Sequence, residues 1–351
     1  MNKAVFFTLI RQILIKNSGD ENMLKFALFD AREYDRPAFE RCSEKYGFAL
    51  KFFETKLNED TVTLANGFDG VIVFVNDTVN KEVIDKLTEY GVKIIALRCA
   101  GFNNVDLKSA KNRITVVRVP AYSPQAIAEH TMALLLSAVR KIHKAYIRTR
   151  SFNFSINEFT GFELQGKTVG IIGTGRIGKA FIEICKGFGM QVICYDPHPD
   201  GNGKYNYVPL ETIFSGSDII SLHCPLTAEN KHIINRETIS KMKNGAIILN
   251  TSRGQLIDTQ ALIEGIRSEK IGAACLDVYE EESDVFFEDH SSVIIRDDTL
   301  LRLISLPNVI VTSHQAFLTR EALNSIAETT SENLRCFFGG KTQNEVEYRE
   351  Q

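Results

Sequence analysis

One segment constrains the fold of this 351-residue chain more than any other: a glycine-rich turn between an apolar run and a helical run. The apolar run Lys167–Ile172 leads directly into Gly173-Thr-Gly-Arg-Ile-Gly178, and Lys179–Phe188 has a helical pattern. A GxGxxG turn between a strand and a helix is typical of the first βαβ unit of a dinucleotide-binding sheet. Its first glycine allows the tight turn, the second lets the backbone approach a pyrophosphate, and the third lets helix and strand pack closely. The sequence therefore predicts a doubly wound parallel sheet that binds a nucleotide at the start of this helix.

The strand after this helix indicates which dinucleotide binds. QVICY ends at Asp196, eighteen residues beyond Gly178, where a carboxylate can accept hydrogen bonds from both hydroxyls of the adenosine ribose. The same carboxylate repels a 2′-phosphate, and the nearest cation, Lys204, is eight residues further along. We therefore expect NAD rather than NADP. The residues expected to contact NAD are Gly173, Thr174, Gly175, Arg176, Ile177, Gly178 and Asp196, with Cys224, Pro225, Thr251, Ser252 and Asp277 at the ends of later strands.

Apolar and amphipathic runs alternate through the rest of the chain in two stretches. The first extends from Met23 to Pro120 and has five apolar runs, LKFALFD, FALKFFET, GVIVFV, VKIIALR and ITVVRV. The second begins with the strand before the glycine-rich turn and has six. Between the stretches, Ser123-Pro124 predicts the start of a helix over Gln125–Arg148, apolar on nearly every side through Val139 and expected to lie buried between two domains. The chain length also favours two domains, because single cores stop growing at about 250–300 residues.

Composition argues against several classes of protein. Lys and Arg total 41 against 44 for Asp and Glu, so no positive excess is present to neutralise a nucleic acid. The longest uncharged apolar stretches are about ten residues, well below the 18–20 that cross a bilayer. Seven scattered cysteines without a CxxC pair indicate reduced thiols in a cytoplasmic protein, and the histidine spacing shows no metal site. Residues 1–22 precede the first strand pattern and are expected to be an extension outside the fold.

Three ionisable residues follow strands of the second stretch. Arg253 follows AIILNTS, Glu282 follows GAACLDVY, and His314 ends NVIVTS. In an open parallel sheet the carboxyl ends of the strands meet at the edge where ligands bind. The forked guanidinium of an arginine can hold a keto acid's carboxylate, a histidine exchanges a proton near neutral pH, and a neighbouring carboxylate favours the imidazolium form. Each residue alone could be a surface or capping residue, but together they are the expected catalytic residues of an NAD enzyme for hydroxy or keto acids.

Several segments resemble the D-isomer-specific 2-hydroxyacid dehydrogenase family. They are Gly173–Gly178, Asn250–Gly254, Asp277–Glu282 and Ser313–Phe317. Three further segments resemble the fermentative D-lactate dehydrogenases of that family, namely Leu97–Asp106, Val119–Pro124 and Ser283–His290. The resemblance implies that pyruvate and NADH give D-lactate and NAD, with Arg253 binding substrate and His314 as acid/base. Ser313, where many relatives have proline, and residues 1–22 depart from the pattern.

The family resemblance also assigns further residues of the site. Backbone amides near Ala100 and Gly101 are implied to bind the substrate carboxylate, while Tyr122 and Phe317 shape the pocket. The second glutamate of the family's Asp-Val-Tyr-Glu-x-Glu pattern pairs with the histidine. That glutamate is Glu282 here, with its neighbour Glu281 as the alternative in a run of three glutamates.

The resemblance implies two Rossmann-like α/β domains with the active site in the cleft between them. Residues 23–122 and 318–351 are expected to form the substrate-binding domain, and residues 123–317 the NAD-binding domain. Assembly as a homodimer or homotetramer is expected from the habit of the family.

Two other functions stay open. The substrate could be another 2-hydroxy acid, although phosphoglycerate is disfavoured because AGFNNV offers no cation beyond Arg98. The chain could instead be a non-catalytic NADH-sensing protein like the co-repressors built on the same fold. The presence of Arg253, Glu282 and His314 favours catalysis.

Overall fold

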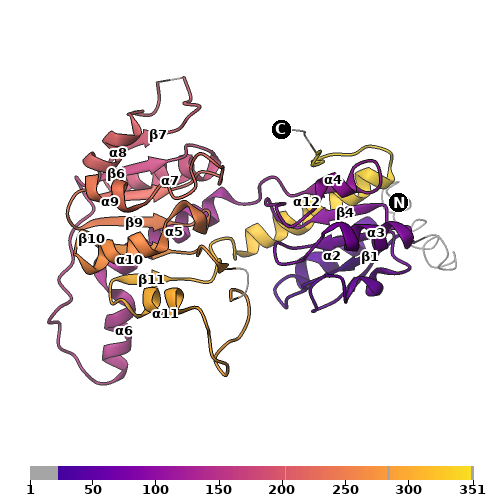
Figure 1. Cartoon of the computed structure of the whole chain (residues 1–351), viewed down its shortest axis with the longest axis horizontal. Coiled ribbons are helices and arrows are strands. Elements are labelled where there is room, and N and C mark those ends of the chain that lie inside the picture. The colour runs from indigo at the N-terminus through magenta and orange to yellow at the C-terminus, as the bar shows by residue number, and fades with distance from the viewer. Residues whose placement is uncertain (1–22, 202, 283–284, 349–351) are drawn as a thin grey trace, which may run out of the picture. The chain divides into compact units, whose positions relative to one another are not determined.

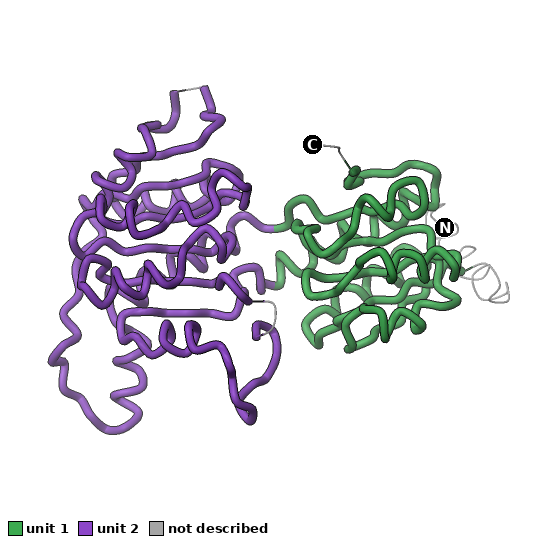
Figure 2. Tube along the Cα trace, viewed as in Figure 1, with its two compact units in different colours: residues 1–122, 320–351 green, residues 123–319 purple. Residues whose placement is uncertain are grey.

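The computed structural model describes residues 23–201, 203–282 and 285–348, which form two units (Figure 2). Unit 1 comprises the described residues up to Tyr122 and from Arg320 onward, and unit 2 is Ser123–Thr319. Each unit is a parallel sheet covered by helices, so the predicted class of two doubly wound α/β domains is confirmed (Figure 1). The extension expected at residues 1–22 lies outside the described residues, as do Ser283 and Asp284.

Unit 1 contains a five-stranded sheet with the order β2-β1-β3-β4-β5. Its strands, all parallel, are β1 (Lys25–Leu28), β2 (Ala49–Phe52), β3 (Gly70–Val73), β4 (Ile94–Leu97) and β5 (Thr115–Arg118). Its helices are α2 (Arg36–Tyr46), η1 (Val62–Ala65), α3 (Lys81–Glu89), α4 (Leu107–Ala110) and α12 (Arg320–Phe338). The strands β3 and β4 are buried along their whole length, because helices cover both faces of the sheet.

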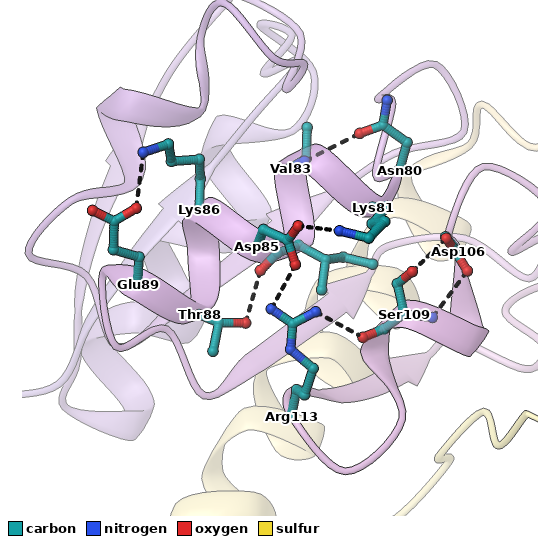
Figure 3. A network of polar contacts seen from close by, with 11 residues as sticks. Asn80, Lys81, Val83, Asp85, Lys86, Thr88, Glu89, Asp106, Ser109 and Arg113 are labelled. Atoms are coloured by element: carbon teal, nitrogen blue, oxygen red, sulfur yellow. Dashed lines mark hydrogen bonds and ion pairs between the residues drawn. The ribbon is translucent and has the colours of Figure 1, made fainter.

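A network of polar side chains joins the helices on the surface of unit 1 (Figure 3). The side chain of Asn80 accepts a hydrogen bond from the Val83 amide and so caps α3. Asp85 lies 2.5 Å from the Lys81 ammonium and 2.7 Å from the Arg113 guanidinium, which connects α3 to the turn before β5. Exposed pairs of this kind contribute little to stability, because solvent screens the two charges.

Unit 2 contains a six-stranded parallel sheet with the order β11-β10-β9-β8-β6-β7. Its strands are β6 (Thr168–Ile172), β7 (Gln191–Tyr195), β8 (Ile219–Leu222), β9 (Ala246–Asn250), β10 (Ile271–Leu276) and β11 (Val309–Val311). Its helices are α5 (Pro124–Arg140), α6 (Ile142–Arg150), α7 (Arg176–Gly187), α8 (Leu210–Gly216), α9 (Arg236–Lys241), η2 (Gly254–Leu256), α10 (Thr259–Arg267) and α11 (Asp298–Ser305). From β6 the chain continues to β7 on one side and then to β8 on the other side, so the direction of strand order reverses between β6 and β8. Ligands of such sheets bind at this point of reversal.

The long helix predicted to continue to Arg148 is interrupted, and this expectation was wrong. Helix α5 begins after Ser123, whose side chain caps it as predicted, but it ends at Arg140. Lys141 adopts a left-handed conformation (φ 51°), and α6 starts after it. The physical reason is burial: α5 packs against α7 and β10, whereas α6 contains no buried residue.

Helix α6 and the segment that follows it form an arm, residues 141–163, in which large apolar side chains are exposed. These side chains are Ile142, Tyr146, Ile147, Phe152, Phe154, Ile156 and Phe162. None of the helices in the described part of the chain is long and apolar enough to cross a bilayer.

Candidate functional site

The glycine-rich turn follows β6 and leads into α7, as its sequence context predicts. Gly173 has φ 98°, and a Cβ there would lie 2.6 Å from the carbonyl carbon of His223 at the end of β8. A Cβ on Gly178 would lie 2.1 Å from the carbonyl oxygen of Gly173. Packing within the protein therefore excludes side chains at these two positions.

The middle glycine differs from the other two. A Cβ on Gly175 would have no described atom within 4 Å, so packing within the chain does not require glycine there. Gly175 is the N-cap of α7 and has no side chain that could bond the first amides of the helix. Open space beside uncapped amides at a helix N-terminus suits the pyrophosphate of a dinucleotide. Arg176, exposed, and Ile177, half-buried, occupy the first turn.

Asp196 lies beside this turn, just beyond the end of β7. One carboxylate oxygen accepts hydrogen bonds from the Thr174 amide (2.7 Å) and hydroxyl (3.0 Å), and the other accepts from the His198 amide (2.9 Å). A carboxylate has about four acceptor positions, so capacity remains for a ribose hydroxyl. The sequence analysis missed Tyr207, whose backbone pairs with Cys194 of β7. Its hydroxyl lies 2.8 Å from the Thr174 hydroxyl and so connects the segment beside β7 to the glycine-rich turn.

Four more residues expected to contact the cofactor lie at the ends of β8 and β9, which are adjacent strands. Cys224 is buried and Pro225 is exposed. The Ser252 hydroxyl donates to the Cys224 carbonyl (2.5 Å), and the Thr251 hydroxyl lies 2.8 Å from that of Thr131 on α5. These bonds join the two strand ends to each other and to α5.

His314 and Glu282 are in direct contact. The Nδ1 atom of His314 lies 3.1 Å from an Oε1 oxygen of Glu282, and the other oxygen of Glu282 accepts from the Tyr279 amide at 3.2 Å. The ring of Phe287 lies 5.8 Å from the imidazole, centroid to centroid. Since Nδ1 faces the carboxylate, Nε2 is the imidazole nitrogen that can exchange a proton with a substrate.

The three consecutive glutamates have different surroundings. Glu280 lies 2.6 Å from Nε2 of His232 and accepts from the Thr259 hydroxyl at 3.0 Å. Glu281 is exposed. Among the residues that the structure describes, Glu282 is thus the glutamate placed against His314.

Asp277 is fully buried behind the segment that carries His314. Its carboxylate accepts from the Thr312 hydroxyl (2.5 Å) and from the Gln315 and Ala316 amides (2.9 and 2.8 Å). Its backbone carbonyl accepts from the His314 amide at 2.8 Å. These bonds position the segment that carries His314, and the cofactor contact expected for Asp277 stays a prediction.

His130 on α5 was missed by the sequence analysis. Its Nε2 atom lies 3.2 Å from the Thr312 hydroxyl and 3.4 Å from the Asp277 carboxylate, on the inner side of the segment that carries His314. A histidine in a helix that is expected to be buried is a signal that could have indicated such a contact, because buried polar groups need hydrogen-bond partners.

Arg253 is carried by a short loop after β9. Its Nη1 atom donates to the Ser252 carbonyl at 2.7 Å. The fully buried side chain of Asn250 holds the loop, accepting from the Ser252 amide (3.0 Å) and donating to the Arg253 carbonyl (2.9 Å). A Cβ on Gly254 would lie 1.9 Å from the Tyr279 carbonyl oxygen, so this loop packs directly against the strand end that leads to Glu282. The sequence analysis missed this role of Asn250, although a polar amide at the end of the apolar strand AIILN is a signal that could have indicated it.

The residues implied to bind substrate lie in both units. Ala100 and Gly101, half-buried, follow β4 in unit 1, and the Ala100 carbonyl accepts from Nη1 of Arg118 at 2.7 Å. Tyr122 is half-buried in unit 1, and Phe317 is buried in unit 2. Within the described ranges, no group of three or more His, Cys, Asp or Glu residues is arranged to hold a metal ion.

Comparison with known proteins adds independent findings. A family model described as the NAD-binding domain of D-isomer-specific 2-hydroxyacid dehydrogenases matches residues 132–316. The sequence is 50% identical over 323 residues to a D-lactate dehydrogenase of Escherichia coli strain K12, covering 91% of this chain and 98% of that protein. The structure is similar to the apo-structure of D-lactate dehydrogenase from Escherichia coli, with a TM-score of 0.85 and 48% identity over 92% of this chain and 100% of that one. It is also similar to a structure described as the pyruvate reductase of Chlamydomonas reinhardtii, with a TM-score of 0.87 and 41% identity over 91% and 97% of the two chains.

Proposed function

The chain belongs to the D-isomer-specific 2-hydroxyacid dehydrogenase family, and we infer that it catalyses the reversible reduction of pyruvate to D-lactate by NADH. One observation carries this inference. The Glu282–His314 pair lies at the carboxyl edge of the same parallel sheet whose first strand leads into the glycine-rich turn. A proton donor and a dinucleotide-binding turn on one sheet edge are two parts that hydride transfer to a carbonyl requires.

NAD is the cofactor of this family, and the residues of the turn fit it. The uncapped amides at the start of α7, beside the open space at Gly175, suit the pyrophosphate. Asp196 is the residue proposed to hold the adenosine ribose and to repel a 2′-phosphate. When bound, NADH supplies the hydride for the carbonyl carbon of the substrate.

The chain's own residues hold the substrate and move the proton. Arg253 would bind the substrate carboxylate through its forked guanidinium and polarise the carbonyl that is reduced. His314, as imidazolium, would donate its Nε2 proton to the carbonyl oxygen, and the same nitrogen would remove that proton when D-lactate is oxidised. Glu282, against Nδ1, fixes the orientation of the ring.

The cation next to Ala100 and Gly101 in the sequence is not free to bind a phosphate. This cation, Arg98, is only 1% exposed. Its guanidinium donates to the Asp30 carbonyl at 2.6 Å and to the Asp35 carboxylate at 3.2 Å. The other nearby cation, Arg118, donates to the Ala100 carbonyl at 2.7 Å, so the choice between pyruvate and a phosphorylated acid is left to the experiment below.

We propose that two or four copies of the chain assemble, and that the arm takes part. Phe152, Phe154 and Ile156 are 85%, 73% and 82% exposed, and exposed apolar patches of this kind mark protein–protein contacts.

A cytoplasmic location is proposed because all seven cysteines are free thiols, as in a reducing compartment.

The direct test is NADH oxidation by the purified protein with a panel of 2-keto acids that includes pyruvate, a branched acid and a phosphorylated acid. Pyruvate should give the highest kcat/KM, and NADPH should be a poor substitute for NADH. A protein that binds NADH but reduces none of these acids would favour the NADH-sensing alternative, which the family comparison does not support.

A further inference from the structure

The loop after β4 is held through its backbone carbonyls. The Ala100 carbonyl accepts a hydrogen bond from Nη1 of Arg118 at 2.7 Å, and the Gly101 carbonyl accepts from the Cys99 thiol at 3.3 Å. The guanidinium carbon of Arg118 also lies 5.1 Å from the centroid of the Phe102 ring. Arg118 is the last residue of β5, so a neighbouring strand end holds this loop.

Holding a carbonyl also orients an amide. In a trans peptide the C=O of one residue and the N–H of the next point in opposite directions, and the described residues contain no cis peptide. Because Arg118 holds the Ala100 carbonyl, the Gly101 N–H must point away from the guanidinium. Neither the Ala100 nor the Gly101 amide donates a hydrogen bond to any residue that the structure describes. These amides are therefore available to a ligand, and adjacent amides of this kind form anion-binding concavities.

The backbone of Arg118 is itself fixed. Its amide donates to the Asn344 carbonyl at 3.1 Å, and its carbonyl accepts from the side-chain amide of Asn333 at 2.9 Å. The two asparagine side chains bond each other at 2.8 Å, and Asn333 is only 1% exposed. Residues of α12 and of the segment after it fix the backbone of Arg118, and the Ala100 carbonyl and the Phe102 ring hold its guanidinium, so the arrangement exists without a ligand, as a preorganised site requires.

The charge of the guanidinium adds to its geometric effect. An arginine stays protonated at any physiological pH, so the bond to the Ala100 carbonyl is charge-assisted. Such a bond polarises the peptide group and strengthens the donor on the opposite side. Arg118 would thus strengthen the hydrogen bond from the Gly101 N–H to a bound anion, although its guanidinium does not contact that anion.

We propose that Arg118 is a positioning residue for the substrate carboxylate, which it orients and strengthens through the Ala100–Gly101 peptide. This proposal rests on the proposed function, in which the amides of Ala100 and Gly101 bind the carboxylate of pyruvate. The carboxylate takes no part in bond making or breaking, so its loss of binding affects ground state and transition state alike. Arg118 therefore governs KM for pyruvate and leaves kcat and NADH binding nearly unchanged.

The experiment compares Arg118→Met with Arg113→Met. Arg113 is a matched control, because it lies before the other end of β5, contacts Asp85 at 2.7 Å and donates to the Ser109 carbonyl at 3.3 Å (Figure 3). Arg118→Met should raise KM for pyruvate about tenfold, the effect of losing one charge-assisted contact. The Kd for oxamate, an isostere of pyruvate, should rise by the same factor, while kcat and the Kd for NADH change less than twofold. Arg113→Met should change none of these quantities.

A second variant keeps the proposal testable if Arg118→Met does not fold. Arg118→Lys keeps the charge and can still donate a hydrogen bond, but it loses the planar fork, so it should raise KM for pyruvate by a smaller factor than tenfold. An unchanged KM in folded Arg118 variants would overturn the proposal. An equal fall in kcat and in NADH affinity would also overturn it, because that result indicates general disruption of the protein.

If the unmodified protein reduces pyruvate and the Arg118 variants keep its KM, only this inference fails. If the unmodified protein reduces no 2-keto acid, the proposed function fails and this inference fails with it.

Discussion

His314 adopts a left-handed backbone conformation (φ 53°) that residues other than glycine rarely adopt. Such a conformation costs about 1–3 kcal/mol and persists only where the surroundings determine it. Here the Asp277 carbonyl accepts from the His314 amide, and the Asp277 carboxylate holds the next two amides. The strained backbone accompanies an imidazole that faces Glu282, the residue proposed as its partner in catalysis.

Single residues also show the limit of sequence-based prediction. The places of Arg253, Glu282 and His314 after strands could be predicted, because strand ends of a parallel sheet lie at one edge, while their catalytic roles stay predictions. Glu282 was the expected partner of His314, with Glu281 as the alternative, and the structure places Glu282 against the imidazole. Glu280 contacts His232 instead, a contact between residues 48 positions apart that no local pattern indicates.

Replacing Glu282 by glutamine should lower kcat/KM for pyruvate at least about tenfold. The amide that replaces the carboxylate has one oxygen acceptor instead of two, so it can no longer hold both the His314 ring and the Tyr279 amide, and the imidazole is less well oriented. Glu281→Gln is the matched control, because its side chain is exposed, and it should leave kcat/KM unchanged. The measurement is kcat/KM for both variants, and a loss in Glu281→Gln alone would transfer the role to Glu281.

Replacing Arg253 by lysine should lower kcat/KM for pyruvate by about 10²-fold, through both KM and kcat. Lysine keeps the charge but loses the planar fork that binds a carboxylate and a carbonyl together. Arg236→Lys is a suitable control, since Arg236 is exposed and pairs only with Glu264 among the contacts described for it. An arginine with a merely structural role would instead lower the melting temperature of Arg253→Lys and leave its kinetics per folded molecule unaltered.

At the level of elements, the alternation of apolar and amphipathic runs was sufficient to predict the architecture. The five apolar runs before Pro120 correspond to β1–β5 and the six later ones to β6–β11. This worked because strands covered on both faces are continuously apolar. The break at Lys141 could not be predicted from the same pattern, because the helical period continues into α6 while burial stops.

The glycine-rich turn allows packing and ligand binding to be separated by two substitutions. Gly178→Ala places a Cβ 2.1 Å from the Gly173 carbonyl oxygen, so it should lower the melting temperature. Gly175→Ala meets no described atom within 4 Å and should fold normally, yet raise the Kd for NADH at least about tenfold by blocking the pyrophosphate. Thermal unfolding and NADH titration of both variants check this, and normal NADH binding by Gly175→Ala would contradict the assignment.

For the whole molecule, the arm provides a test of assembly. Phe152→Asp combined with Phe154→Asp places two charges on the most exposed apolar part of the arm, so it should reduce the mass of the particle in solution. Ile294→Asp is the control, because Ile294 is 89% exposed but lies outside the arm. Light scattering during size-exclusion chromatography gives the masses. A monomeric unmodified protein, or an unchanged mass in the double variant, would remove the arm from the interface.

The measurement that tests the central claim most directly is the configuration of the product made from pyruvate and NADH. The protein should convert pyruvate stoichiometrically to lactate, one NADH oxidised for each lactate formed, and chiral chromatography should identify that lactate as the D-isomer. The double variant His314→Ala with Glu282→Gln should form product at least about 10²-fold more slowly, because the proton donor is lost. Formation of L-lactate, or no lactate from a folded protein that binds NADH, would contradict the account.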